Sequence, residues 1–330
     1  MISARAWCRV DLAGGTLDLW PLGLLHEGAS TVNLAVDLAV RASLRHSTDG
    51  GWRVVQGGEE HRAGDRSDLL HHPETALVGH VAETLDLPPL EVSLSSASPR
   101  GGGLGASSAL AVALLAAGEA WLGRPASSAS ALAAVARDLE ARMMNLPTGT
   151  QDHYGAQLGG ALVLTYPPGG VRVRRLDAVD LEALGKCLVI AYSGQSHFSA
   201  GKNWQVVKRR LDGDPEAIAT FAGIAAAAAA LAEALEAGDL PRVGALVAEE
   251  WRHRRRLAEG VSTPGLEAML AAAREAGAWG GKACGAGGGG CLAVLCPQKR
   301  RAAVAQALVA AGAEILEAAP TALPLEITRS

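Results

Sequence analysis

A run of glycines and serines near residue 100 is the stretch of this sequence that points most directly to chemistry. Glycine lets a ligand approach the backbone closely, and serines before an apolar run are typical of a helix start. The first turn of a helix has unpaired N–H groups and partial positive charge, which suit phosphate. The stretch therefore predicts a phosphate-binding loop, and the alternative is a glycine-rich turn before a buried helix. Its residues are Pro99, Arg100, Gly101, Gly102, Gly103, Leu104, Gly105, Ala106, Ser107 and Ser108, followed by the apolar run 109–117.

This loop does not match two common nucleotide-binding motifs. A Walker A loop needs Gly-x-x-x-x-Gly-Lys followed by Ser or Thr, and the sequence contains no such run. The Rossmann spacing Gly-x-Gly-x-x-Gly does occur at Gly285, Gly287 and Gly290. That motif lies between a strand and a helix, whereas here a helical pattern precedes it and the strand-like run 292–295 follows it. We therefore expect no dinucleotide-binding fold.

Two carboxylates downstream of the loop could complete a site. Glu140 lies at the edge of an apolar stripe with helical spacing over residues 132–143, so it either contacts solvent or points into a site. Asp152 lies in the polar stretch 145–154, which interrupts that helix. Near the N-terminus, a strand pattern leads into a glycine turn that ends in a third carboxylate, Asp18.

Composition excludes several classes of function. The 330 residues carry a net charge of −4, so no general attraction to nucleic acid or to an anionic membrane is expected. The five cysteines are scattered without zinc-ligand spacing, which indicates reduced thiols in a cytoplasmic protein. No signal-like N-terminal segment is present, and no uninterrupted apolar stretch reaches the roughly 20 residues of a membrane span. The nearest candidate, residues 222–235, is interrupted by Glu233.

The elements that must position these residues are strands in the first block, followed by helices. We expect a loop over the polar residues 57–74, and an α+β fold overall, because strands and helices are mixed in this order. Strands are expected at 3–12, 31–45, 52–55, 91–95, 161–166, 171–176, 187–192, 291–296, 314–317 and 324–327. Helices are expected at 75–85, from 109 to about 122, from Pro125 to the break at Asn145, and at about 203–211, 215–236, 239–258, 264–276 and 298–311.

A proline-glycine stretch predicts the domain boundary. Pro167-Pro168-Gly169-Gly170 is the clearest linker in the chain, so we expect one domain over 1–168 and another over 169–330. In the second domain, a polar loop containing Gln195, Ser196 and His197 follows a strand, and a stretch rich in glycine spans 280–290.

Three separated motifs together resemble one family, the GHMP small-molecule kinases. The loop at 99–110 is similar to the family's second motif, which wraps ATP phosphates, with Ala106 in place of its first serine and Ser107 as its second. Residues 282–291 are similar to the third motif, and residues 9–18 to the first motif in its sugar-kinase form. The motifs occur in the expected order and span the chain.

Within the family, the chain most resembles kinases that act on the anomeric hydroxyl of a sugar, such as heptose 7-phosphate kinases and fucokinases. The shared features are the first motif and the stretch Gly149–Tyr154; galactokinases differ in the first motif, of which this chain keeps only Asp18. The resemblance implies an N-terminal domain like ribosomal protein S5 domain 2 and a ferredoxin-like C-terminal domain.

The resemblance also implies roles at the site. ATP would bind the loop from Pro99 to Ser108, with its phosphates on backbone amides, and Mg²⁺ would bind Ser107 and Glu140, which offer the oxygen ligands that this ion prefers. Asp152 would accept the proton of the sugar hydroxyl, and Arg9 would stabilise the transferring charge. The residues implied in substrate binding are Asp18, Gly14, Gly15, Gly287, Gly288, Gln195, Ser196 and His197; the last three could equally form an ordinary polar loop.

Several alternatives remain open on the sequence alone. The chain could phosphorylate another small alcohol, such as galactose, mevalonate or homoserine, or it could be a catalytically silent sensor of nucleotide or sugar. The arginine-rich stretch 251–256 is typical of a solvated helix face, and the alternative is that it binds a substrate phosphate. The expected partner is a small sugar or sugar phosphate, with no nucleic acid and no membrane, and the chain is expected to be a monomer or a homodimer.

Overall fold

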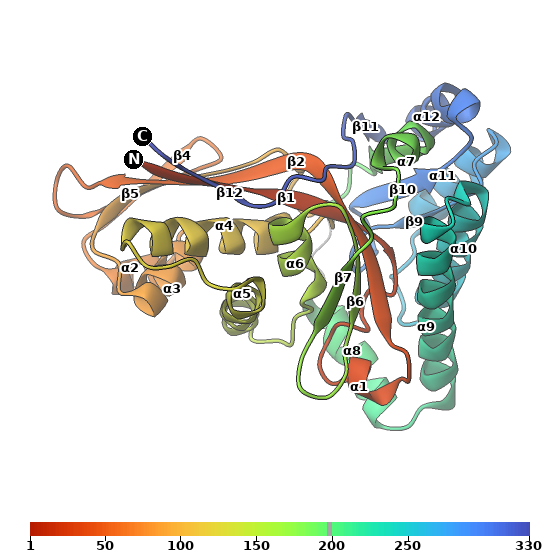
Figure 1. Cartoon of the computed structure of the whole chain (residues 1–330), viewed down its shortest axis with the longest axis horizontal. Coiled ribbons are helices and arrows are strands. Elements are labelled where there is room, and N and C mark those ends of the chain that lie inside the picture. Colours follow the sequence, from red (N-terminus) through yellow and green to blue (C-terminus); the bar gives the residue numbers. More distant parts are fainter. Residues whose placement is uncertain (197–199) are drawn as a thin grey trace.

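Two β-sheets, each covered by helices, form the framework of the protein (Figure 1). The computed structural model describes residues 1–196 and 200–330. The described chain mixes strands and helices in both halves, and the predicted α+β class is confirmed.

The first sheet has eight strands in the order β12-β1-β2-β5-β3-β4, with β6 paired to β2 and β7 paired to β6. The two longest strands, β1 and β2, run antiparallel, while β3 and β5 are parallel neighbours and are joined through two helices. The strands are β1 (Ile2–Ala13), β2 (Ser30–His46), β3 (Trp52–Gln56), β4 (Glu59–Ala63), β5 (Leu90–Ser96), β6 (Ala161–Thr165), β7 (Arg172–Arg175) and β12 (Glu326–Arg329).

Helices cover one face of this sheet, and α4 is the central one (Figure 1). Twelve of the 16 residues of α4 are buried, as expected for a helix that is apolar on every side. Its many alanines allow close packing on β1 and β2. The helices of the first half are α1 (Leu22–Leu25), α2 (Arg66–His71), α3 (Ala76–Leu85), α4 (Ala106–Trp121), α5 (Ala129–Met144) and α6 (Gln151–Leu158).

The second sheet is antiparallel, in the order β11-β8-β10-β9. A long pair of helices, α9 and α10, packs between this sheet and β1 of the first sheet. The strands are β8 (Leu188–Tyr192), β9 (Gly280–Ala283), β10 (Cys291–Leu295) and β11 (Glu314–Leu316). The helices are α7 (Leu181–Cys187), α8 (Ala200–Leu211), α9 (Pro215–Glu236), α10 (Leu240–Arg254), α11 (Pro264–Glu275) and α12 (Arg301–Ala310), with a 3-10 turn at Gln298–Arg300 before the last.

The expected loop over residues 57–74 is wrong, because this stretch holds β4 and α2. Both elements are mostly exposed and rich in polar residues, so a prediction based on apolar patterns did not find them. A local signal was present, since Asp65 caps α2 by accepting the backbone N–H of Asp68.

The two sheets do not divide the chain at residue 168. β7 follows the proline-glycine stretch but pairs with β6, so the expected boundary falls in a hairpin of the first sheet. The last strand, β12, also returns to pair with β1, which brings the two termini side by side (Figure 1). The first sheet therefore includes chain from both halves.

Helix α9 is long and apolar enough, by length and composition, to cross a membrane. This was not expected, because Glu233 interrupts the apolar run at 222–235. In the structure 56% of that stretch is buried within the protein, where it packs on α10, β1 and β2. A helix in a protein core has the same apolar composition, and the contacts of α9 place it in the core of this fold.

The turn after β1 yields a stability prediction with a matched control. Gly14 has φ +86°, and a Cβ there would lie 2.0 Å from the carbonyl oxygen of Ser30, whereas Gly28 has φ +70° and no atom of the described residues lies within 4 Å of its Cβ position. Gly28→Ala should lower the free energy of unfolding by only about 1–2 kcal/mol, the cost of a left-handed backbone conformation for a residue with a Cβ. Gly14→Ala should lower the free energy of unfolding by about 1–3 kcal/mol more, because the new methyl group would force Ser30 on β2 to move. Urea unfolding measures both, and equal losses would contradict the packing.

Candidate active site

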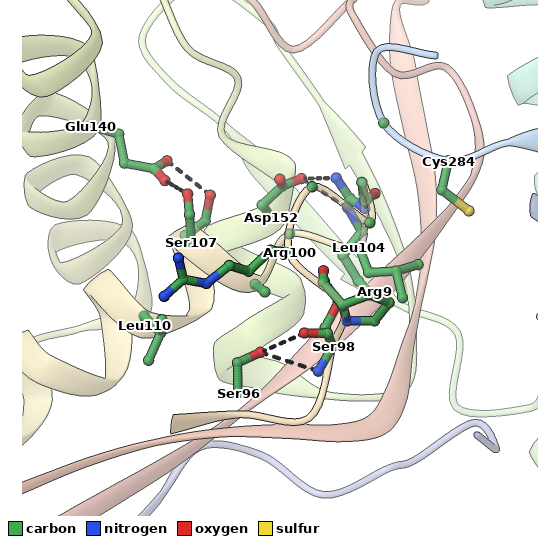
Figure 2. A pocket seen from close by; sticks show the side chains of 18 of the residues that line it. Arg9, Ser96, Ser98, Arg100, Leu104, Ser107, Leu110, Glu140, Asp152 and Cys284 are labelled. Atoms are coloured by element: carbon green, nitrogen blue, oxygen red, sulfur yellow. Dashed lines mark hydrogen bonds and ion pairs between the residues drawn. The ribbon is translucent and has the colours of Figure 1, made fainter. Parts of the chain in front are cut away.

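A cavity of about 900 Å³ lies where the phosphate-loop candidate meets the end of β1, the start of α6 and the glycine loop between β9 and β10 (Figure 2). This volume is at the upper end of the range for small-molecule sites. Asp152 and Arg254 line this cavity, which extends to residues of β2, β3 and β5, among them Ser43 and Val55.

The N-terminus of α4 opens into this cavity. Its N-cap is Gly105, at φ 72°, and no side chain in the described part of the chain caps the helix. The loop before it approaches the second glycine loop so closely that a Cβ on Gly103 would lie 2.6 Å from the carbonyl oxygen of Cys284. An uncapped N-terminus of a 16-residue helix is suited to an anion.

A carboxylate with three polar partners lies beside the first turn of α4. The hydroxyls of Ser107 and Ser108 donate to the two oxygens of Glu140, at 2.5 and 2.8 Å (Figure 2). The imidazole of His153 lies 2.9 Å from Glu140. Burial by itself raises the pKa of Glu140, but His153 and the two serines outweigh it and lower the pKa below its ordinary value. The carboxylate is therefore ionised at neutral pH.

Asp152 lies between the loop and the first sheet. Arg9 donates from Nε to Oδ1 of Asp152 at 2.8 Å and from Nη1 to the carbonyl oxygen of Gly103 at 2.7 Å. Arg9 is buried on β1, whereas the Asp152 side chain keeps 24% of its surface exposed toward the cavity. The Asp152 carboxyl also lies against Gly105, about 3.2 Å from the position of a Cβ there. This carboxylate is thus fixed beside the helix terminus.

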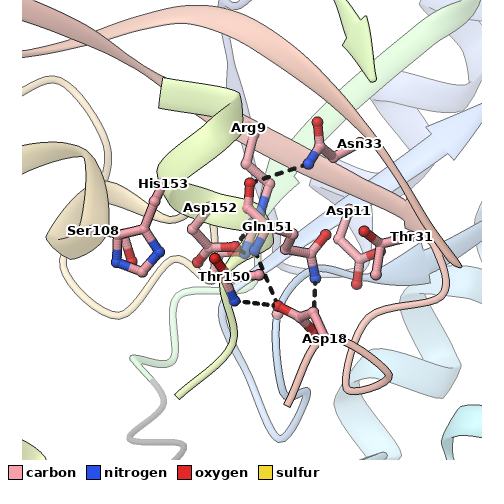
Figure 3. A network of polar contacts seen from close by, with 12 residues as sticks. Arg9, Asp11, Asp18, Thr31, Asn33, Ser108, Thr150, Gln151, Asp152 and His153 are labelled. Atoms are coloured by element: carbon pink, nitrogen blue, oxygen red, sulfur yellow. Dashed lines mark hydrogen bonds and ion pairs between the residues drawn. The ribbon is translucent and has the colours of Figure 1, made fainter. Parts of the chain in front are cut away.

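Asp18 holds the start of the helix that carries Asp152. Its Oδ2 accepts the backbone N–H groups of Thr150 at 2.8 Å and Gln151 at 3.1 Å (Figure 3). Burial and the nearby charge of Asp152 raise the pKa of Asp18, and the backbone N–H donors oppose this rise only in part. Within residues 1–196 and 200–330, Oδ1 has one weak contact, from the Gln151 amide at 3.5 Å.

Four buried charges next to this site were not predicted from the sequence. Lys282 on β9 lies 3.2 Å from Asp11 on β1 and 3.0 Å from Glu250 on α10, and Arg254 contacts both acids. All four side chains are at most 2% exposed. Arg254 belongs to the arginine-rich stretch 251–256, which we expected to form a solvated helix face. That expectation is correct for Arg252, which is exposed, but wrong for Arg254, which is buried.

The structure brings together most of the residues predicted for the site. The predicted residues that line the cavity are Arg9, Gly15, Asp18, Pro99, Gly101, Gly102, Gly103, Leu104, Gly105, Ala106, Ser107, Ser108, Glu140, Asp152 and Gly287. Four others do not line it: Gly14 packs on Ser30, Gly288 donates to the Val261 carbonyl, and Gln195 and Ser196 are exposed. His197 lies outside the described residues.

Comparison with known proteins identifies the family. A family model for the N-terminal domain of GHMP kinases matches residues 74–160, and one for the C-terminal domain matches residues 231–314. These two segments contribute α4, Glu140, Asp152, Arg254 and the second glycine loop to the cavity. The chain belongs to the GHMP kinase family, and the two-domain fold predicted from the three motifs is confirmed.

Individual relatives include kinases of sugars and of mevalonate. The chain is 30% identical over 213 residues to D-glycero-alpha-D-manno-heptose 7-phosphate kinase of Campylobacter jejuni, covering 61% of this chain but only 60% of that protein. It is 30% identical over 255 residues to a mevalonate kinase of Pyrococcus horikoshii, covering 76% and 72%. A crystal structure of a D-glycero-D-manno-heptose 1-phosphate kinase from Bacteroides thetaiotaomicron has a TM-score of 0.81 at 20% identity, covering 100% and 99%.

Proposed function

We propose that the chain is an ATP- and Mg²⁺-dependent kinase that phosphorylates the anomeric hydroxyl of a sugar or sugar phosphate. The observation that carries this proposal is the place of Asp152, whose partly exposed carboxylate lies against the uncapped N-terminus of α4 and is held by Arg9. A phosphate-binding helix terminus and a carboxylate within one cavity are what phosphoryl transfer to an alcohol requires.

The donor end of the cavity suits a metal-bound triphosphate. Backbone N–H groups from Gly102 to Ser108 would hold the phosphates at the start of α4. The Ser107 hydroxyl and the ionised Glu140 carboxylate are adjacent oxygen donors of the kind that Mg²⁺ prefers. Bound Mg²⁺ would neutralise charge on the phosphate oxygens.

The acceptor end provides a proton acceptor. Asp152 would accept the proton of the attacking hydroxyl, and an anomeric hydroxyl is more acidic than an ordinary alcohol, so a carboxylate can serve. Arg9 would keep Asp152 oriented toward the cavity and would offset negative charge as the phosphoryl group moves.

Asp18 favours a sugar over mevalonate or homoserine. Among the described residues, its Oδ1 has only the weak contact from the Gln151 amide at 3.5 Å, so this oxygen is available to accept a sugar hydroxyl. A silent sensor is disfavoured because Asp152, Glu140 and Ser107 are all present and assembled.

Product analysis tests the proposed reaction directly. The purified protein with Mg·ATP and a panel of free and phosphorylated sugars, mevalonate and homoserine should consume ATP only with a sugar. Phosphorus NMR of the product should show a phosphate on the anomeric carbon. A phosphate found only on another hydroxyl, or ATP consumption only with mevalonate or homoserine, would refute the assignment.

Asp152→Asn tests the proton acceptor. Asn has nearly the same shape but cannot take up the proton, so kcat should fall at least about 10²-fold while ATP still binds. Steady-state kinetics and calorimetry of nucleotide binding measure the two effects. Asp138→Asn, an exposed carboxylate on α5, is the control and should be unchanged. A raised KM with kcat nearly intact would limit Asp152 to substrate recognition.

Glu140→Gln tests the metal ligand. The amide keeps one oxygen for the serine hydroxyls but has no charge, so the Mg²⁺ concentration for half-maximal nucleotide binding should rise at least about tenfold, by analogy with loss of a metal-site partner. Calorimetric titration at several Mg²⁺ concentrations measures this without turnover. Glu119→Gln on α4, where the carboxylate also accepts a serine hydroxyl, is the control. Unchanged Mg²⁺ dependence would remove Glu140 from the site.

A further inference from the structure

Arg254, the last residue of α10, has every donor of its side chain in use. A guanidinium has five N–H donors. Nε and Nη2 donate to Glu250 at 2.8 and 2.6 Å, and Nη2 also donates to the carbonyl oxygen of Gly15 at 2.7 Å. Nη1 donates to the hydroxyl of Thr16 at 3.1 Å and more weakly to the carbonyl oxygen of Gly285 at 3.5 Å. These five contacts account for all five donors.

The surroundings of Arg254 keep it charged and in place. Burial alone lowers its pKa, but Glu250 and Asp11 outweigh burial and raise the pKa above its ordinary value. Lys282 balances the second negative charge, so the four buried groups sum to zero. A buried cation held on several sides has little freedom to turn toward a ligand.

The contacts of Arg254 reach both glycine-containing segments of the site. Gly15 and Thr16 belong to the turn after β1, and Gly285 belongs to the loop between β9 and β10. Thr16 has φ 75°, a backbone conformation that few residues other than glycine adopt, so the turn needs support from its surroundings. Arg254 supplies that support from the second domain.

The same turn continues to the catalytic helix. Within it, Leu17 donates its N–H to the Gly14 carbonyl at 3.1 Å. Asp18, at the end of the turn, accepts the N–H groups of Thr150 and Gln151 (Figure 3). The residue that follows Gln151 is Asp152. A connected set of contacts thus leads from α10 through the turn to the start of α6.

We propose that Arg254 is a positioning residue, which holds the Gly15–Asp18 turn so that Asp18 fixes the start of α6 and the direction of the Asp152 carboxylate. The inference rests on the proposed function, in which Asp152 is the catalytic group. It differs from direct binding of a substrate phosphate by Arg254, because all five donors are committed to the protein itself.

Arg254→Lys tests this role. Lysine keeps the positive charge for Glu250 but cannot reach Gly15 and Thr16 in the same geometry. We expect kcat to fall between about tenfold and 10²-fold, the effect of a small misplacement of a catalytic group, with KM for ATP changed less than threefold and KM for free and phosphorylated acceptors changed by similar factors. Arg252→Lys, an exposed arginine on the same helix, is the control and should match the wild type. A raised KM confined to phosphorylated acceptors, with kcat spared, would overturn the proposal.

Hydrogen exchange provides a second readout that needs no turnover. The amides of Leu17, Thr150 and Gln151 should exchange at least about tenfold faster in Arg254→Lys than in Arg252→Lys, while amides in the centre of α4 stay protected. Unchanged exchange at these three amides would overturn the proposal. Because this readout is independent of the acceptor, it decides the role of Arg254 even if the acceptor panel shows no sugar kinase activity.

Thr16→Ala tests the same role in case Arg254→Lys does not fold. It removes the hydroxyl that Nη1 contacts, together with the γ-methyl group, and leaves the four buried charges intact. It should change kcat and the exchange of Leu17 in the same direction as Arg254→Lys, by a smaller factor. If Arg254→Lys does not fold, wild-type kcat and exchange in Thr16→Ala would overturn the proposal.

Discussion

The shape of the site depends on four buried charges between the two domains. Asp11 comes from the first sheet, Lys282 from the second, and Glu250 and Arg254 from α10, which packs against both. Buried ions are tolerated only when each is paired, so these side chains restrict the two sheets to one relative position. The glycine loops on the two sides of the cavity then face each other at a fixed distance.

That fixed distance explains why glycine is needed where the loops meet. The backbone of Gly103 lies so close to Cys284 that a side chain would displace one loop. The α4 terminus, the Ser107–Glu140 pair and the Arg9–Asp152 pair therefore converge on one space. In the proposed reaction, the Ser107–Glu140 pair belongs to the phosphate donor and the Arg9–Asp152 pair to the hydroxyl acceptor. The two pairs would then give the cavity a direction, from donor to acceptor.

Much of this arrangement could be predicted from the sequence through its motifs. The pairing of Ser107 with Glu140 and of Arg9 with Asp152 follows the roles implied by the family resemblance. Arg254 could not be found in this way, because it is one of four arginines in the stretch 252–256 and differs from the other three in being buried against Asp11 of the first sheet. His153 was missed for a similar reason, since its partner Glu140 lies on the preceding helix.

The sequence by itself determined most of the local elements, with β4 and α2 as exceptions. The bounds expected for the helix at 215–236 match α9, because capping by Asp214, the proline at its start and the apolar composition act within the helix. The tertiary structure alone decided that Asp18 binds backbone N–H groups at Thr150 and Gln151, and that Gly14 packs on β2 rather than lining the cavity. Those contacts join residues far apart in the chain, and they depend on strand register and domain packing, which local patterns of residues do not encode.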